Sequence, residues 1–499
     1  MLYRKGWETV FRLEEAWLQD HDLYHELLEA SEKLSVSNGC RFYEPSPYHI
    51  GIVCDEFIYL NYEPACHLHY LPSDWQEDML AGLDLVLVVS PWRGIDQSWA
   101  GVSLASSGAR ESLFRLLRLC RRCSIPTAFY SKEDPPNFRI FLSCAKEADF
   151  VFTSAVECIP AYQRECGHDR VYPLHFAVNP LLNNPIDSER YAADQNAVLF
   201  AGSWMKKYPQ RIREQRQLFQ WIQETGVPFH ILDRNSGRRD PAYRYPARWQ
   251  KNLLPAVPYG SLPKMNKLHG WVLNLNSVTD SRSMFSMRVY DALACGCPVL
   301  SNGSAGMERL LPEVRVIRTR EDIDAAFSMT REERKALRLA GIRRVMEGNT
   351  VFDRMTEILT GCGLTAPPVR RTVAVLADCL PEEAHALAEQ FQAQTYPDKV
   401  FLTDKEELRN LEDVSALALW KSDRRYGRFY LEDCMNAFRY TASDYTVFGQ
   451  TEDGEAFVFS DSAADPFSTV YWINGSLKKR IPSILAGQTR LNAGFWLSD

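Results

Sequence analysis

The sequence lacks any long hydrophobic run. Its longest apolar stretches, such as Leu83–Val89, have the length of a strand, whereas a membrane-spanning helix needs roughly 18–20 apolar residues. The first residues, Met1–Glu8, also lack the apolar stretch of a signal peptide. We therefore expect a cytoplasmic protein without a transmembrane segment, for which peripheral contact with a membrane stays open.

An excess of positive charge is missing as well. The 499 residues contain 57 Lys and Arg against 64 Asp and Glu, so the net charge is -7. A dedicated DNA- or RNA-binding protein usually needs a basic face. The composition therefore excludes nucleic acid as the expected partner, although it is compatible with a local basic pocket for a nucleotide diphosphate.

Two further patterns are absent. The 13 cysteines are scattered, and the single C-x2-C pair, Cys120 and Cys123, has no second pair to complete a zinc site. The first expected strand is followed by Cys54-Asp-Glu-Phe57 rather than by the glycine-rich G-x-G-x-x-G turn. These absences argue against a structural metal site and against an NAD-dependent enzyme.

What the chain does contain is an alternation of short apolar runs and helical patterns, which predicts an α/β protein with parallel sheets. The expected domains are 1–178, with a helical extension over 1–45, then 179–362, and finally 370–499. The expected strands are His49–Cys54, Leu83–Ser90, Thr127–Ser131, Phe150–Thr153, Ala197–Ala201, Phe229–Leu232, Trp271–Leu275, Pro298–Ser301, Val314–Ile317 and Thr372–Leu376. The expected helices are 8–35, Glu111–Cys123, Tyr208–Thr225, Ser286–Ala294, a pair within Arg331–Leu359, and Glu382–Thr395.

The most informative stretch is Asn274–Ser301. An apolar strand runs into a polar loop, the loop opens a helix that carries Arg288 and Asp291, and the helix stops at Gly296 before the next strand. Such a unit places a helix N-terminus, a cation and a carboxylate at the carboxyl edge of a parallel sheet. Open α/β sheets bind nucleotides at that edge.

Several segments, in this order, resemble the CgeB-like spore-maturation glycosyltransferases of the GT-B superfamily. They are Cys54–Phe57, Val89–Trp99, Ser131–Phe138, Phe152–Pro160, Phe200–Arg211, Asp233–Asn235 and Asn274–Ser301, the last of which contains the turn Ala292-Leu-Ala-Cys-Gly-Cys-Pro-Val299. The resemblance implies a GT-B fold, in which two Rossmann-like domains face a cleft. It also implies transfer of a sugar from a nucleotide-diphosphate donor, UDP-linked, without an obligatory metal or other cofactor.

Related GT-B enzymes hold the donor ribose with a carboxylate just before that turn, and Asp291 occupies the position, one methylene shorter than the usual Glu. Asp291 could instead only complement the helix dipole. Arg288 lies on about the same helix face and either meets the diphosphate or pairs with Asp291. Where the superfamily often has a second Glu that contacts the sugar, this chain has Ser283.

The other expected donor residues lie in loops that follow strands. Hydroxyl and N–H groups at the helix start can meet phosphate or simply cap the helix. The cations near Gly202 can neutralise the leaving diphosphate or lie on a solvated face, and Asp233 and Arg234 either line the base or ribose pocket or form a turn. The residues concerned are Gly202, Ser203, Lys206, Lys207, Arg211, Asp233, Arg234, Asn276, Ser283, Met284 and Phe285.

The first domain would supply the acceptor side. Asp55 is the first candidate for a catalytic base or acceptor ligand, Glu133 is the second, and His175 near the interdomain crossing is the third. Each could equally have a structural role at a strand end. Trp92 and Trp99 could stack on a sugar ring or pack in the core.

The last 130 or so residues resemble a family-2-type GT-A domain. The segment expected to hold its metal-binding aspartates reads Lys421-Ser-Asp-Arg-Arg425, and one Asp among three cations is a poor cation site. We expect a degenerate, non-catalytic module that packs on the GT-B core or binds an acceptor or partner.

The sequence thus predicts a glycosyltransferase whose acceptor is a cell-surface glycan, a glycolipid or a protein. The alternative is a scaffold that keeps the GT-B fold and binds a nucleotide or sugar without catalysis. Ser283 and the altered third domain motivate this alternative.

Overall fold

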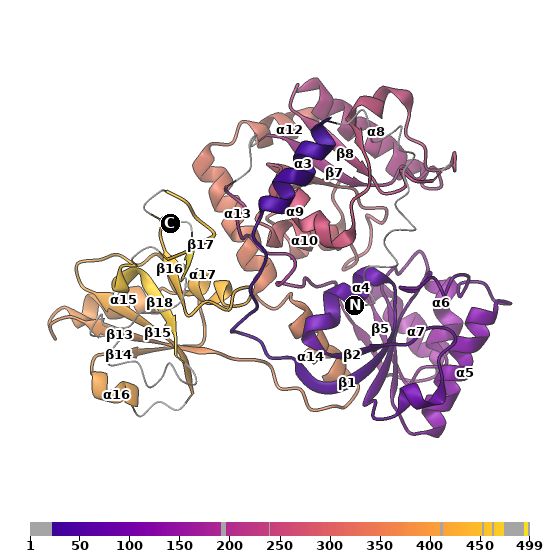
Figure 1. The fold of residues 1–499 in the computed structure, drawn as a ribbon, viewed down its shortest axis with the longest axis horizontal. Coiled ribbons are helices and arrows are strands. Elements are labelled where there is room, and N and C mark those ends of the chain that lie inside the picture. Colours follow the sequence, from indigo (N-terminus) through magenta and orange to yellow (C-terminus); the bar gives the residue numbers. More distant parts are fainter. Residues whose placement is uncertain are drawn as a thin grey trace. The chain divides into compact units, whose positions relative to one another are not determined.

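The computed structural model describes residues 22–190, 196–238, 240–409, 413–451, 454–461, 464–473 and 494–497. The chain divides into two compact units (Figure 1). Unit 1 consists of Met1–Lys33, Pro45–Asn179 and Ala192–Pro367. Unit 2 consists of Leu34–Glu44, Pro180–Tyr191 and Pro368–Asp499.

The first sheet of unit 1 is parallel throughout, with the order β2-β1-β3-β4-β5-β6. Its central strand β3 reads Leu-Val-Leu-Val-Val and is buried at every position, as expected when helices cover a parallel sheet. The strands are β1 Ser46–Val53, β2 Cys66–Tyr70, β3 Leu85–Val89, β4 Thr127–Ser131, β5 Phe150–Thr153 and β6 Val171–Pro173. The helices between them are α4 Glu56–Tyr62, α5 Gly108–Arg122, α6 Phe138–Ala145 and α7 Ile159–Cys166.

The second sheet of unit 1 is also parallel, with the order β12-β11-β10-β7-β8-β9. Its strands are β7 Val198–Gly202, β8 Phe229–Asp233, β9 Leu253–Leu254, β10 Trp271–Asn274, β11 Val299–Ser301 and β12 Arg315–Val316. Its helices are α8 Pro209–Glu224, α9 Leu262–Lys267, α10 Arg288–Ala294, α11 Ala305–Leu310, α12 Arg320–Phe327 and α13 Arg331–Met346. Two more helices belong to unit 1, namely α3 Asp22–Lys33 and α14 Val351–Gly361, and α14 packs against α4 of the first half.

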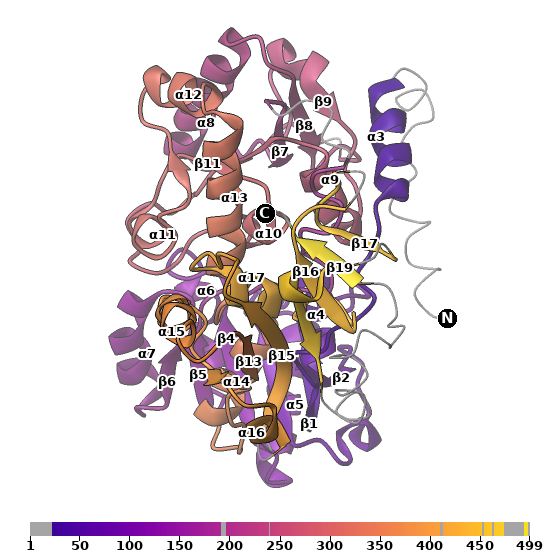
Figure 2. The ribbon, with the colours of Figure 1, turned by 90° about the vertical axis from the view of Figure 1, so that its left-hand side faces the viewer.

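Unit 2 contains a mixed sheet with the order β14-β13-β15-β18-β16-β19-β17 among the described residues (Figure 2). Strands β13, β14 and β15 are parallel, whereas β18 runs antiparallel to β15 and β16. The strands are β13 Thr372–Asp378, β14 Lys399–Leu402, β15 Val414–Lys421, β16 Tyr445–Phe448, β17 Val458–Ser460, β18 Thr469–Trp472 and β19 Gly494–Leu497. The helices are α15 Ala384–Gln392, α16 Lys405–Arg409 and α17 Tyr430–Ala437.

The segment Leu34–Glu44 belongs to unit 2 although it precedes β1 in the chain. Arg41 forms an ion pair with Asp444 at 2.7 Å, and its Nε donates to the carbonyl of Ala442 at 3.0 Å. The guanidinium of Arg439 lies over the ring of Phe42, 3.8 Å from its centroid. These contacts stabilise the N-terminal segment within unit 2.

The predicted α/β class is confirmed, because unit 1 contains two parallel sheets with helices between their strands and the C-terminal part of the chain forms a further α/β sheet. Of the helix expected over 8–35, Asp22–Lys33 forms and 1–21 lies outside the described residues. Within the described part of the chain, no helix is both long enough and apolar enough to cross a membrane.

Candidate functional site

Several predicted donor residues lie at the carboxyl edge of the second sheet. Strands β7 and β8 are in register at Gly202 and Asp233, and β10 and β11 are in register at Asn274 and Ser301. Because all four strands are parallel, their ends gather at one edge. Helix α10 begins at Arg288, after the polar loop that follows β10.

Asn276 organises that loop. Its Oδ1 accepts a hydrogen bond from the N–H of Ser286 at 3.1 Å, and its Nδ2 donates to the Oγ of Ser301 at 3.3 Å and to the carbonyl of Gly303 at 3.3 Å. Its own N–H donates to Asn302. Because these groups already bond to protein, Asn276 fixes the loop before α10 rather than presenting a free group.

Arg288 and Asp291 are the least satisfied polar side chains on α10. Asp291 is 4% exposed, and its Oδ1 has no hydrogen-bond partner among the described residues. The Nε of Arg288 is likewise buried without a partner there, and one of its terminal nitrogens reaches Asn274 at 3.4 Å. A buried polar atom without a partner is costly, so an unpaired donor and acceptor on one short helix indicate a binding position.

Three guanidinium groups influence one another at this edge. Burial, together with the neighbouring positive charges of Arg211 and Arg234, lowers the pKa of Arg288 to about 10. Burial also raises the pKa of Asp291 to about 7, against the opposing effect of Arg288. The local field is therefore positive although the whole chain is acidic, which favours a bound anion.

Gly202 has a packing role that the sequence did not reveal. A Cβ atom at this position would lie 2.6 Å from the ring of Phe200, which is fully buried. The guanidinium of Arg288 lies over that same ring, 5.9 Å from its centroid. Because Gly202 has no side chain, the ring of Phe200 fits beside it, and the guanidinium of Arg288 lies over that ring.

The cations after β7 fall into two groups. Arg211, in the first turn of α8, is buried and donates to the carbonyl of Ser203 at 3.0 Å, while its Nε has no partner in the described structure. Lys206 and Lys207 are exposed, and the ammonium of Lys207 lies over the ring of Tyr208 at 4.8 Å. Arg211 is therefore held in place, whereas the two lysines have solvated side chains.

The segment after β8 forms a turn and also faces the donor edge. Asp233 accepts from the N–H of Asn235 at 2.9 Å, and Asn235 donates to the Oγ of Ser203 at 2.8 Å. Burial raises the pKa of Asp233 to about 6. Arg234 is exposed, and its N–H donates to the carbonyl of Gly202 at 3.1 Å.

Ser283 connects the two halves of unit 1. Its Oγ donates to the carbonyl of Ser154 at 2.9 Å and accepts from the N–H of Val156 at 2.9 Å. The next residue, Met284, packs against the core of the first half, and the ring of Phe285 stacks with a neighbour in α10. These three residues hold the donor loop in place through contacts with the protein.

On the first sheet, Asp55 organises the loop after β3. Its carboxylate accepts from the N–H groups of Trp92, Arg93 and Gly94 at 3.0–3.2 Å, and it pairs with the fully buried Lys132 at 3.1 Å. Burial opposes ionisation of Asp55, but Lys132 and the N–H groups outweigh burial and lower its pKa. This environment suits a permanently ionised structural carboxylate better than a proton acceptor.

The remaining acceptor-side candidates also make contacts within unit 1. Glu133 accepts from the indole N–H of Trp92 at 3.0 Å, whereas Trp99 is fully buried and packs in the core. Burial and the charge of Arg354 lower the pKa of His175 to about 4, although a backbone group of Ser283 opposes this. His175 is therefore neutral near pH 7 and faces the donor loop.

The sequence reasoning missed Glu157 and Tyr259. Both carboxylate oxygens of Glu157 are buried without a hydrogen-bond partner among the described residues, and Glu157 follows directly after the backbone group that bonds to Ser283. The hydroxyl of Tyr259 is also buried and unpaired in that part of the chain, and its pKa is raised by burial and by the charge of Asp291. Glu157 lies within the segment Phe152–Pro160 that carries the resemblance, but no pattern singled out its carboxylate, and Tyr259 belongs to none of those segments.

Comparison with known families identifies one segment. Residues 211–360 match the family described as "Glycosyl transferase-like", so this part of the chain is glycosyltransferase-like. The matched segment includes Arg211, Asp233, Arg288 and Asp291. None of the curated proteins matches the chain.

Some solved structures share a distant overall similarity. An alpha-glucosyltransferase in complex with UDP and a 13-mer DNA containing a HMU base is 11% identical, with a TM-score of 0.44, over 64% of this chain and 100% of that chain. Anabaena HepE in complex with UDP-glucose is 12% identical, with a TM-score of 0.42, over 62% and 99%. The UDP-GlcNAc 2-epimerase of Methanocaldococcus jannaschii is 9% identical, with a TM-score of 0.35, over 62% and 99%. At these TM-scores the similarity assigns no property of those proteins to this chain.

Proposed function

We propose that this protein is a cytoplasmic glycosyltransferase of the GT-B type, related to the CgeB-like family. It moves a sugar from a nucleotide-diphosphate donor, with UDP-sugars as the first candidates, to a glycan, glycolipid or protein acceptor. The observation that carries the proposal is the pair on α10, in which Arg288 and Asp291 each keep a buried polar atom without a partner among the described residues. Both lie in the glycosyltransferase-like segment.

In this proposal Asp291 binds the donor ribose. A carboxylate offers two acceptor oxygens, and the two hydroxyl groups of a ribose offer two donors. The free Oδ1 of Asp291 can accept one of these hydrogen bonds without breaking any contact within the protein. Binding would also favour the ionised form and return the raised pKa of Asp291 toward its ordinary value.

The diphosphate binds to the guanidinium groups. Arg288 and Arg211 are fixed by protein contacts and each presents an unpaired Nε, while Arg234 adds an exposed charge. When the acceptor oxygen attacks the anomeric carbon, the bond to the diphosphate oxygen breaks and negative charge gathers on the leaving group. Preorganised guanidinium groups stabilise that charge in the transition state.

The acceptor hydroxyl must lose a proton during transfer. We propose that the carboxylate of Glu157 takes up this proton, because both of its oxygens are free of hydrogen bonds within the described structure. Glu133 is the second candidate, and His175 the third. Asp55 instead supports the loop Trp92–Gly94 that we place beside the acceptor.

The competing function is a non-catalytic scaffold that binds a nucleotide or sugar. It is favoured by Ser283, because the hydroxyl that stands where the superfamily often has a sugar-binding Glu is used entirely for contacts with Ser154 and Val156. This alternative predicts nucleotide binding without turnover.

A combined binding and turnover experiment separates the two functions. Calorimetric titration with UDP, GDP, CDP and dTDP first identifies the base, and hydrolysis of the corresponding nucleotide sugars then measures turnover. Asp291→Ala and Arg288→Ala should each weaken nucleotide binding about tenfold or more, whereas the exposed Asp280→Ala should not. Glu157→Gln should keep binding and lose turnover. Nucleotide binding without hydrolysis of any nucleotide sugar would favour the scaffold. Unchanged nucleotide binding in Asp291→Ala would refute the donor site.

A further inference from the structure

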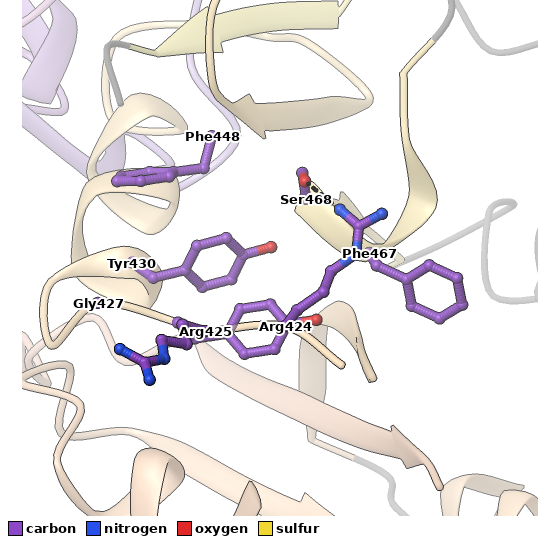
Figure 3. A pocket seen from close by; sticks show the side chains of 8 residues that line it. Arg424, Arg425, Gly427, Tyr430, Phe448, Phe467 and Ser468 are labelled. Carbon is purple, nitrogen blue, oxygen red and sulfur yellow. Dashed lines mark hydrogen bonds between the residues drawn. The ribbon is translucent and has the colours of Figure 1, made fainter. Parts of the chain in front are cut away.

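A pocket of about 280 Å³ lies in unit 2, far along the chain from the donor residues (Figure 3). Pockets that take small molecules usually measure roughly 300–1,000 Å³, so this one has room for a single sugar residue rather than for a nucleotide sugar. Its lining residues are Arg424, Arg425, Tyr426, Gly427, Tyr430, Phe448, Phe467 and Ser468.

One wall of the pocket is aromatic and rigid. The ring of Tyr426 stacks on Trp420 with centroids 4.1 Å apart and planes within 1°. Tyr430 packs edge-on against Tyr426 at 5.2 Å and against Phe448 at 5.4 Å. Aromatic faces fixed in this way offer apolar surface to the C–H groups of a sugar ring.

The aromatic wall carries one unsatisfied polar group. Tyr430 is 2% exposed, and its hydroxyl has no hydrogen-bond partner among the described residues. In Figure 3 this hydroxyl points from the aromatic side toward Ser468 and Arg424. A buried hydroxyl without a partner is costly unless a ligand supplies one.

The opposite side of the pocket is positively charged. Arg424 pairs with Asp465 and also donates to the Oγ of Ser468 at 3.2 Å, and Lys421 pairs with Asp423 at 3.1 Å. Arg425 is exposed and forms no ion pair in the described structure. Counting Lys421, Arg424 and Arg425 against Asp423 and Asp465, the residues in and next to the pocket carry a net positive charge.

We propose that this pocket binds a sugar residue that carries a phosphate or carboxylate group. The sugar ring packs on Tyr426 and Phe448, a sugar hydroxyl bonds to Tyr430, and the acidic group meets Arg424. The cations that replace the expected aspartates thus have a binding function of their own. This site does not depend on the donor site in unit 1.

Calorimetric titration of the full chain tests the proposal. The probes are glucose 6-phosphate, glucuronate, glucose and inorganic phosphate. We expect at least one acidic sugar to bind about tenfold or more tightly than both glucose and inorganic phosphate, because ring and charge contribute together. Binding of glucose 6-phosphate alone identifies a phosphate ligand, and binding of glucuronate identifies a carboxylate ligand.

Variants locate the site. Arg424→Gln and Tyr430→Phe should each weaken acidic-sugar binding about fivefold or more, with thermal unfolding confirming that both variants fold. Arg428→Ala removes an exposed arginine of the same segment that does not line the pocket and should have no effect. Asp291→Ala should likewise leave this binding unchanged.

Three outcomes would overturn the proposal. Equal affinity for inorganic phosphate and the acidic sugars would mean that only a charged surface is present. If glucose bound as tightly as the acidic sugars, the cations would contribute nothing to sugar binding. Loss of binding in Arg428→Ala or Asp291→Ala, or absence of binding by every probe, would place the site elsewhere or remove it.

Discussion

The Oγ of Ser283 donates a hydrogen bond to the carbonyl of Ser154 at 2.9 Å, across the two halves of unit 1. The same oxygen accepts from the N–H of Val156 at 2.9 Å. One buried hydroxyl therefore joins the loop that precedes Arg288 to the short 3-10 helix Val156–Cys158, which carries Glu157.

Replacing this hydroxyl should destabilise unit 1. In Ser283→Ala the N–H of Val156 loses its acceptor, which should cost about 1–3 kcal/mol and lower the unfolding temperature measured by scanning calorimetry. Ser283→Glu should destabilise more, because the larger side chain has no room in a site that is almost fully buried. Ser286→Ala, in the same loop, is the control. A Ser283→Ala variant as stable as wild type would show that the connection contributes nothing.

The stability of the protein should depend on pH through Asp291. Its pKa of about 7 in the folded state exceeds the ordinary value of 3.8, so the folded protein retains a proton that the unfolded chain releases. Stability should therefore fall as the pH rises from about 4 to about 7. Asp291→Asn removes this effect and should be more stable than wild type at pH 8, by on the order of 1–3 kcal/mol, with little difference near pH 4.

The exposed Asp280→Asn serves as the control for this pH dependence. Denaturant unfolding at pH 4, 6 and 8 measures all three proteins. Nucleotide affinity should rise with pH between 6 and 8 in wild type but not in Asp291→Asn, because the ionised carboxylate accepts the ribose hydroxyls. A stability difference that is the same at every pH would contradict a raised pKa.

A methyl group at position 202 should disturb the donor site indirectly. The added Cβ of Gly202→Ala would overlap the ring of Phe200, and overpacking of a core typically costs about 1–3 kcal/mol. Displacing the ring also removes the surface under Arg288, so nucleotide affinity should fall. Gly237→Ala is the matched control, since its Cβ would meet nothing within 4 Å. If Gly202→Ala and Gly237→Ala bound the nucleotide equally tightly, Gly202 would have no role in binding the diphosphate.

Asp55 should contribute to the pH dependence of stability with the opposite sign to Asp291. Its folded pKa is lowered, so its stabilising contribution is present above about pH 4 and is lost as the pH falls through the folded pKa. Asp55→Asn leaves Lys132 buried without a counter-charge and should cost about 3–5 kcal/mol at pH 7 and less at pH 3. The exposed Asp74→Asn should be neutral. A loss that stays constant from pH 7 to pH 3 would show that the ion pair is not its cause.

The parts of the fold that the sequence predicted are the buried runs. Strands Thr127–Ser131 and Phe150–Thr153 form with the predicted bounds, because apolar residues between turn signals have few alternatives to a covered parallel sheet. Strand β2, Cys66–Tyr70, was not predicted, because it reads Cys-His-Leu-His-Tyr and lies at the edge of the sheet with alternate residues exposed. The place of Leu34–Glu44 in unit 2 depends on partners about 400 residues away, and no local pattern encodes such contacts.

The candidate site shows the same division. The spacing of Arg288 and Asp291 on one helix could be read from the sequence, and both lie on α10. The unpaired state of Glu157 and the packing of Phe200 against Gly202 are consequences of tertiary contacts, so the residue order contains no signal for them. For the same reason the sequence could not distinguish the buried Arg211 from the exposed Lys206.

The way in which Leu34–Glu44 completes unit 2 has a consequence for biosynthesis. The hydroxyl of Ser37 bonds to the carbonyl of Tyr440, 403 positions later, so this segment leaves the ribosome long before its partners exist. At translation rates of about 5–20 residues per second, the delay is about 20–80 s. During that interval the residues of unit 1 can fold as the ribosome advances, while the polar groups of Leu34–Glu44 remain hydrated. If translation stopped prematurely after unit 1, Leu34–Glu44 would lack its partners in unit 2. Chaperones would then bind this segment as part of an incompletely folded chain.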